Sequence, residues 1–277
     1  MQPSKLHQRT LTALIIIPVP IAAVLLLPTE YLALCLGLIL LLAAWEWAAL
    51  SGLVSVVGRL AYTALLAVSL MALWHLLPHR WFLYLTEASV VFWCAVTFIL
   101  LRVRAIERKS GPDPATALAG LAVLIGPWVA IVQLHTYPSV GPYLVLLLFA
   151  LIWTADILAY FAGRRWGRAK LAPRLSPGKT RAGAYGAVGG AALYGLVSGW
   201  ILAVPTLHIL LMVVLFVLVV SASIMGDLFE SFVKRRRDLK DSGHLLPGHG
   251  GLLDRIDSLT AAAPLFTLGI LWLEAHL

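Results

Sequence analysis

The feature that most limits the fold of this chain is a series of apolar stretches, each long enough for a helix to cross a bilayer. A membrane-spanning helix needs about 20 predominantly apolar residues. Nine such stretches follow one another, at Leu11–Leu27, Tyr31–Leu50, Leu60–Leu77, Phe82–Leu101, Thr116–Leu134, Tyr143–Gly163, Ala184–Val204, Leu207–Gly226 and Leu259–His276. Apolar residues make up 61% of the 277 residues and charged residues only 12%, which excludes a soluble globular protein of ordinary composition. The sequence therefore predicts an all-α, polytopic integral membrane bundle of about nine transmembrane helices, folded as a single membrane domain over residues 1–277.

The distribution of Lys and Arg predicts how this bundle lies in the membrane. If the N-terminus starts inside, every Lys and Arg except Arg80 falls on the same side of the membrane, and the positive-inside rule makes that side the cytoplasm. We therefore expect a cytoplasmic N-terminus. We also expect an uncleaved first span, because no small-residue cleavage motif precedes Pro28. The longest polar connections on this side are the loops 164–183 and 227–258, so we expect residues 143–277 to carry the catalytic spans and residues 1–135 to form a scaffold. The connection RVRAIERKSGPDP lacks an acid pair and a glycine cradle, and we expect a solvated basic loop near the lipid headgroups.

The loop 227–258 groups its charged residues in a way that indicates a site for phosphates and a metal ion. Asp227, Glu230, Ser231 and Lys234 are spaced to share one helix face, and Asp254 and Asp257 share a face at the start of the next helix. The segment between them is rich in glycine, which lets the backbone approach a ligand closely. Carboxylates from two helices at one membrane depth suit Mg²⁺, whereas the two histidines of this loop lack the spacing of a zinc site.

Two further ionisable positions lie in apolar stretches, where charged groups are costly and usually functional. Asp156 precedes the basic loop and is expected to line a polar cavity open to the cytoplasm. The sequence leaves open whether Glu46 has a function or is simply a paired or neutral carboxyl near a helix end. In the loop after Asp156, the segment Ser176–Thr180 (SPGKT) places a Lys and a hydroxyl beside a glycine, which is a weak signal for phosphate binding.

These motifs together resemble those of the bacterial phosphatidate cytidylyltransferases, also called CDP-diacylglycerol synthases. The similar segments, in the same order, are WTADILAYFAGRRWG, LSPGKT, SFVKR, KDSG and PGHGGLLDRID. The resemblance is specific over roughly residues 153–263 and general elsewhere. It implies that CTP and phosphatidate react to give CDP-diacylglycerol and pyrophosphate with a divalent metal, beside which some members use K⁺. Where the family usually has an apolar residue and then Glu or Gln after SPGKT, this chain has Arg181 and Ala182, so the role of that side chain is absent or moved.

The pattern and the resemblance give one set of candidate residues. The resemblance implies that Asp227 and Asp254 bind Mg²⁺. The catalytic candidates are Asp227, Lys234, Lys240, Asp241, Asp254 and Asp257, and the substrate-binding candidates are Asp156, Ser176, Lys179, Thr180, Ser231, Arg235, His249, Gly250, Gly251 and Arg255.

The function we expect is that of a phosphatidate cytidylyltransferase in the bacterial inner membrane. Its active site faces the cytoplasm, its substrates are CTP and a phosphatidate of the inner leaflet, and it has no nucleic-acid partner; a homodimer is left open. The alternatives are a CTP-dependent lipid kinase, a CDP-alcohol phosphotransferase, which would show a longer Asp-rich motif, and a cation-coupled transporter, which would need polar groups on the outer halves of the spans.

Overall fold

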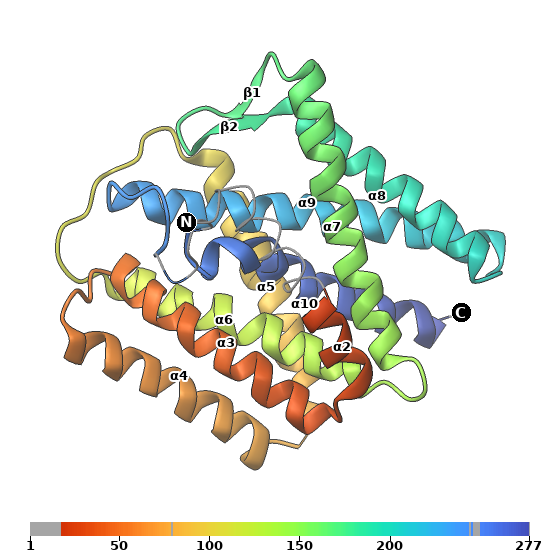
Figure 1. Ribbon diagram of the computed structural model, residues 1–277, viewed down its shortest axis with the longest axis horizontal. Coiled ribbons are helices and arrows are strands. Elements are labelled where there is room, and N and C mark those ends of the chain that lie inside the picture. The colour runs from red at the N-terminus through yellow and green to blue at the C-terminus, as the bar shows by residue number, and fades with distance from the viewer. Residues whose placement is uncertain (1–17, 79, 244, 246–249, 277) are drawn as a thin grey trace, which may run out of the picture.

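The computed structural model describes residues 18–78, 80–243, 245 and 250–276 as an almost entirely helical chain (Figure 1). Its helices are α2 (Pro18–Leu26), α3 (Thr29–Leu50), α4 (Val56–Leu76), α5 (Arg80–Arg102), α6 (Pro114–His135), α7 (Gly141–Trp166), α8 (Arg181–Ile201), α9 (Thr206–Arg236) and α10 (Leu253–His276). A short antiparallel hairpin of β1 (Lys170–Ala172) and β2 (Ser176–Thr180) lies between α7 and α8.

Seven of the described helices are long and apolar enough to cross a membrane: α3, α4, α5, α6, α7, α9 and α10. The predicted all-α, multi-pass membrane fold is thereby confirmed. The remaining two predicted spans differ in detail. α8 spans 21 residues but is rich in glycine and less apolar, and the predicted first span lies partly outside the described residues, with α2 covering its second half. The side of the membrane on which the N-terminus lies stays a prediction.

The helices bury their apolar side chains in two clusters that meet at α9 and α10. The first cluster lies mainly among α3, α4, α5 and α6 and contains Trp47 and Phe82. The second lies mainly among α6, α7, α8, α9 and α10, and includes a stacked pair of rings, Phe216 and Phe266, with centroids 5.8 Å apart. Both clusters take residues from α9 and α10, so this helix pair forms the seam between the two parts of the bundle (Figure 1).

At this seam, α9 and α10 approach each other closely because α9 has a glycine at the crossing. A Cβ atom at Gly226 would lie 2.7 Å from the carbonyl oxygen of Asp257, closer than a Cβ can normally come. The next residue along α9 is Asp227, so the missing side chain brings Asp227 near Asp257. α9 is also long: its 31 residues span about 46 Å at 1.5 Å per residue, against about 30 Å of hydrocarbon. α9 is therefore longer than a span needs to be, and its charged end packs against the first cluster through Leu228 and Val233.

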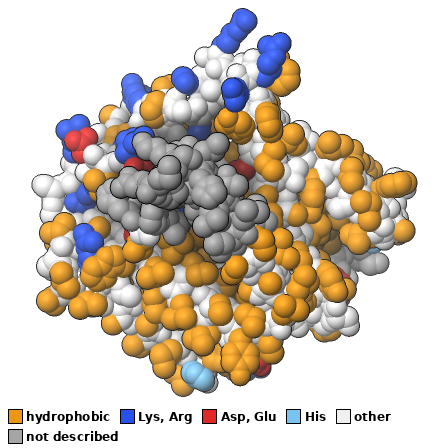
Figure 2. Space-filling view, in the orientation of Figure 1, with side chains coloured by type: hydrophobic (Ala, Val, Ile, Leu, Met, Phe, Trp, Pro, Cys, Tyr) orange, Lys and Arg blue, Asp and Glu red, His pale blue; other side chains and the backbone are white. Residues whose placement is uncertain are grey.

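The hairpin is attached to α9 through its turn. Leu175, between the two strands, is buried in the first cluster, and its carbonyl oxygen accepts a hydrogen bond of 3.3 Å from Nε of Arg235. Figure 2 shows Lys and Arg side chains gathered at the hairpin end of the molecule, while apolar side chains cover the opposite part. The hairpin thus holds the SPGKT segment at the basic end of the bundle.

The loop after α5 is mostly exposed, as expected, but its last residue is tied to α9. Asp113 is only 5% exposed and pairs with Arg236 at 3.1 Å and Lys109 at 3.2 Å. Burial alone would raise the pKa of Asp113, but the hydrogen bond from Thr116 and the charges of Lys109 and Arg236 outweigh it and hold that pKa below its usual value. Arg237, the residue that follows α9, donates to three carbonyl oxygens, of Leu50 (2.8 Å), Lys109 (2.9 Å) and Gly111 (2.7 Å).

Candidate active site

Two adjoining cavities lie beside the seam, at the basic end of the bundle. One of about 450 Å³ is lined mainly by α7, α8, α9 and the hairpin, with Ser258 of α10, and one of about 280 Å³ is lined by α7, α9 and α10. Both are lined by Asp156, Asp227 and Ser258, so they are two parts of one polar region. Asp254, Arg255 and Asp257 line the smaller cavity. Asp156 thus lines a cavity, and Asp227 of α9 faces the same space as Asp254 and Asp257 of α10; that this space opens to the cytoplasm stays a prediction.

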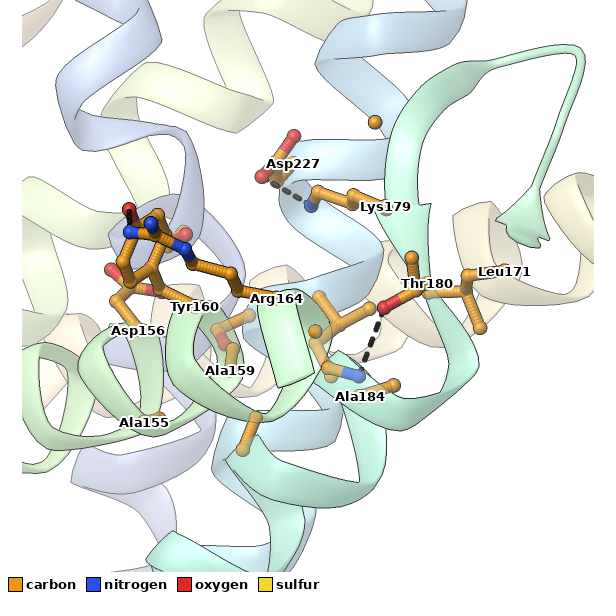
Figure 3. A pocket seen from close by; sticks show the side chains of 17 residues that line it. Ala155, Asp156, Ala159, Tyr160, Arg164, Leu171, Lys179, Thr180, Ala184 and Asp227 are labelled. Carbon is orange, nitrogen blue, oxygen red and sulfur yellow. Dashed lines mark hydrogen bonds and ion pairs between the residues drawn. The ribbon is translucent and has the colours of Figure 1, made fainter. Parts of the chain in front are cut away.

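In the larger cavity a Lys of the hairpin meets a carboxylate of α9. Nζ of Lys179 pairs directly with Oδ2 of Asp227, as Figure 3 shows. The two side chains are 28% and 26% exposed, so the pair is accessible from the cavity. The hydroxyl of Thr180 accepts a hydrogen bond of 3.1 Å from the backbone N–H of Gly183 and thereby caps α8. The hairpin and the start of α8 are consequently fixed around Lys179.

The opposite wall of the larger cavity belongs to α7. Asp156, Tyr160 and Arg164 follow one another along this helix and lie side by side in Figure 3. Arg164 donates a hydrogen bond of 3.1 Å to the hydroxyl of Tyr160. Between α7 and α8 the lining is made of small residues, namely Ala155, Ala159, Gly163, Gly183, Ala184 and Ala187. The cavity therefore has a charged end near Asp227 and a narrow apolar wall between two helices.

The carboxylates at the start of α10 have protein partners. Asp254 accepts from Nζ of Lys234 at 2.5 Å through Oδ1, and from the backbone N–H groups of Ser242 (3.1 Å) and Gly251 (2.9 Å) through Oδ2. Lys234 is 8% exposed and also lies 3.1 Å from Glu230. The ammonium group of Lys234 thus compensates the buried carboxylate of Glu230 and the partly buried carboxylate of Asp254. Asp257 accepts a hydrogen bond of 2.7 Å from the N–H of Ser258.

A carboxylate from the first half of the chain also reaches this region. Glu46 on α3 is 3% exposed and accepts hydrogen bonds from the Ser242 hydroxyl (2.9 Å) and from the N–H groups of Leu252 (3.0 Å) and Leu253 (2.9 Å). The sequence marked Glu46 only as an ionisable residue in an apolar stretch. A contact over 196 to 207 residues of separation leaves no local pattern, so its partners could not have been predicted.

The remaining predicted residues lie around the two cavities rather than inside them. Ser231 is 3.5 Å from Asp227, and Arg235 contacts the hairpin turn and the carbonyl oxygen of Leu239. Ser176 begins β2, while Lys240 and Asp241 are exposed in the loop after α9. Gly250 has a positive φ of 82° and Gly251 is buried, which places both in the turn before α10. His249 lies outside the described residues. The roles assigned to all these residues stay predictions.

The comparison with known proteins agrees with the motifs that line these cavities. The profile of the Cytidylyltransferase family matches residues 7–272. The chain belongs to this family. The phosphatidate cytidylyltransferase of Pseudomonas aeruginosa is 41% identical to it over 267 residues, 96% of this chain and 97% of that protein. That of Haemophilus influenzae is 36% identical over 289 residues, 95% and 97% of the two chains, and that of Brucella abortus is 42% identical over 195 residues, 66% and 64%. The resemblance predicted from the sequence motifs is therefore confirmed.

The cavities of this family member suit a metal ion that shares its ligands with a substrate. Among the described residues, no group of three or more His, Cys, Asp and Glu side chains is arranged to hold a metal by itself. The smaller cavity is nevertheless lined by four aspartates, and one of them, Asp227, already accepts a cationic group, the ammonium of Lys179. Hard oxygen donors in small number fit Mg²⁺, which commonly takes one or two carboxylates, several waters and substrate phosphates.

Proposed function

We propose that the protein is a phosphatidate cytidylyltransferase, which joins CTP and phosphatidate to give CDP-diacylglycerol and pyrophosphate. The observation that carries this proposal is the larger cavity, in which Lys179 and Asp227 lie at the end of an apolar wall between α7 and α8. Such a cavity can take a polyphosphate at its charged end and an acyl chain along its apolar wall. The near full-length relatives that bear this name support the same conclusion.

The reaction needs positioning and charge neutralisation more than proton transfer. The phosphate monoester of phosphatidate is largely dianionic near neutral pH, since its second pKa is about 6, so it attacks without a general base. One oxygen of this phosphate forms a bond to the α-phosphorus of CTP, and the bond from that phosphorus to the oxygen bridging to the β-phosphorus breaks. Pyrophosphate leaves with the bonding electron pair. The negative charge that develops on the phosphates is the quantity that the site must stabilise.

Charged residues from the hairpin, α7, α9 and α10 can provide this stabilisation. Lys179 lies on the hairpin and Arg164 on α7, both at the larger cavity (Figure 3), where they would bind phosphate oxygens of the two substrates. Asp227 and Asp254 would hold Mg²⁺, with Asp156 and Asp257 facing the same space. A bound divalent ion would neutralise charge on the attacked and leaving phosphates. Nothing in the donor set distinguishes a site for K⁺, so a second cation rests on the family resemblance alone.

The substrates would reach the site from different phases. The apolar wall between α7 and α8 supports lateral access of phosphatidate from the inner leaflet, and the concentration of Lys and Arg at the hairpin end (Figure 2) supports a cytoplasmic site in the bacterial inner membrane. CTP would then enter from the cytoplasm. The proposal requires no nucleic acid, and a homodimer is compatible with it but not needed by the site.

The test is an assay of the purified protein in detergent with CTP labelled in the cytosine, phosphatidate and Mg²⁺. We expect labelled CDP-diacylglycerol and stoichiometric pyrophosphate, with no product when Mg²⁺ is chelated. Release of CDP and phosphorylation of a lipid would instead identify a lipid kinase. Flux of a cation across liposomes without turnover of CTP would identify a transporter, and either result would refute the proposal.

A further inference from the structure

Glu46 takes no direct part in the proposed reaction, but it contacts the start of α10, the helix that carries Asp254 and Asp257. The residue belongs to α3, in the half of the chain that lacks the substrate motifs, yet its carboxylate is buried at 3% exposure. A buried carboxylate is costly unless hydrogen bonds satisfy it. Both oxygens of Glu46 are satisfied, and among the described residues their donors are Ser242, Leu252 and Leu253, which come before and at the start of α10.

Two of these donors are the backbone N–H groups of Leu252, just before α10, and of Leu253, its first residue. The first N–H groups of a helix have no partner within the helix, and a carboxylate there satisfies them and interacts favourably with the positive end of the helix dipole. Glu46 therefore caps α10 from another helix, at 3.0 and 2.9 Å. Asp254 satisfies the N–H of Gly251 at 2.9 Å from within α10.

The third donor is the hydroxyl of Ser242, in the connection after α9. Ser242 donates its hydroxyl to Glu46 at 2.9 Å and its backbone N–H to Asp254 at 3.1 Å. The two carboxylates therefore hold the same residue from two sides. The fit is tight, because a Cβ atom added at Gly251 would lie 2.6 Å from Oε2 of Glu46, and this explains why a glycine occupies that position.

We propose that Glu46 is a positioning residue for the reaction: it caps α10 and clamps the turn before it, and thereby fixes where Asp254 and Asp257 face the cavity. This inference rests on the proposed function. Catalysis by alignment is sensitive to displacements of about 1 Å, so a loose start of α10 would lower turnover. The small residues of the wall between α7 and α8 belong to those two helices, so we expect binding of the lipid chain to be affected less than turnover.

The test compares Glu46→Gln with Glu87→Gln, a matched control that alters an exposed Glu on α5. Glutamine has the length of glutamate but presents an N–H₂ group to N–H donors. In Glu46→Gln we expect hydrogen exchange of the amides of Leu252 and Leu253 to accelerate about tenfold, kcat to fall at least tenfold, and KM for phosphatidate to change less than twofold. Glu46→Asp, which keeps the charge but is shorter, should recover part of kcat, and Ser242→Ala should lose less than Glu46→Gln.

Each outcome decides a separate point. Unchanged exchange at the start of α10 in Glu46→Gln would refute the clamp, and accelerated exchange with unchanged kcat would refute its role in the reaction. If Glu46→Gln fails to fold, Ser242→Ala provides the same comparison with only one hydrogen bond to Glu46 removed. The positioning role of Glu46 would then be refuted if Ser242→Ala kept the kcat of the wild type while Glu46→Asp was inactive. A wild-type protein that makes no CDP-diacylglycerol would refute the proposed function, while the exchange measurement would still report on the clamp.

Discussion

Replacement of Arg237 by Ala should destabilise the protein although Arg237 lies away from the cavities. Its guanidinium group joins the end of α9 to the connections after α3 and after α5 through three carbonyl oxygens, at 2.7 to 2.9 Å. Hydrogen bonds to a charged group contribute about 1.5 to 3 kcal/mol each when buried. Two of these three are exposed to solvent, and Nη2 is buried without a partner among the described residues. We therefore take the value of an ordinary hydrogen bond, about 1 kcal/mol per bond and about 3 kcal/mol in total, roughly 150-fold in the unfolding equilibrium.

The assay is denaturant unfolding in mixed micelles, followed by tryptophan fluorescence. Arg237→Ala should lower the free energy of unfolding by about 3 kcal/mol and Arg237→Lys by about 2 kcal/mol, because a single ammonium group cannot reach all three acceptors. The matched control is Arg108→Ala, which removes a nearby arginine whose pair with Asp238 is 74% and 70% exposed and should change stability by less than about 0.5 kcal/mol. If Arg237→Ala behaved like Arg108→Ala, water would be replacing the guanidinium at the three carbonyls and the reasoning would fail.

Three further predictions concern charge and space. Because the pKa of Asp113 is lowered in the folded state, its stabilising contribution is complete above its unfolded pKa of about 4 and is lost as the pH falls. The difference in unfolding free energy between the wild type and Asp113→Asn should therefore become smaller when it is measured from pH 7 down to pH 3. Gly251→Ala should reduce kcat more than tenfold, because its methyl group would overlap the side chains of Ser242 and Glu46. Gly189→Ala should leave kcat unchanged in the same assay, because a Cβ atom there meets nothing within 4 Å. Lys179→Met should reduce kcat by about 10²-fold or more. Because the substitution frees Asp227 from its ion pair, it should also lower the Mg²⁺ concentration needed for half-maximal activity. A higher required Mg²⁺ concentration would contradict competition between Mg²⁺ and the Lys179 ammonium group for Asp227.

The membrane fold and the helix faces of the site could be predicted because they follow from local periodicity. The spacing of Asp227, Ser231 and Lys234 put them on one face of α9, and the structure shows the contacts of that face, from Ser231 to Asp227 and from Lys234 to Asp254. The length of the apolar stretches gave the spans because a helix rises by a fixed distance per residue. Both arguments depend on residues within a few turns of each other.

The rest depended on contacts between distant segments, which a single sequence does not record. Nothing near Glu46 indicates that it reaches Ser242, and nothing near Asp113 indicates Arg236. The hairpin was also missed, since the segment Ser176–Thr180 was expected as a loop and its pairing with Lys170–Ala172 has no alternating apolar pattern. Lys234 was expected at the phosphates, and the structure places its ammonium group between Glu230 and Asp254, so its catalytic role stays a prediction.

The contacts of Glu46 and Arg237 also bear on how the gene could be divided. A break in the connection between α6 and α7, near residue 139, would separate a half with the recognisable motifs from a half without them. The motif-bearing half expressed alone would have an uncapped α10, and the three carbonyl partners of Arg237 would be missing. The two fragments should therefore restore activity only when produced together. In chimaeras with related proteins, α3 should be exchanged together with α9 and α10.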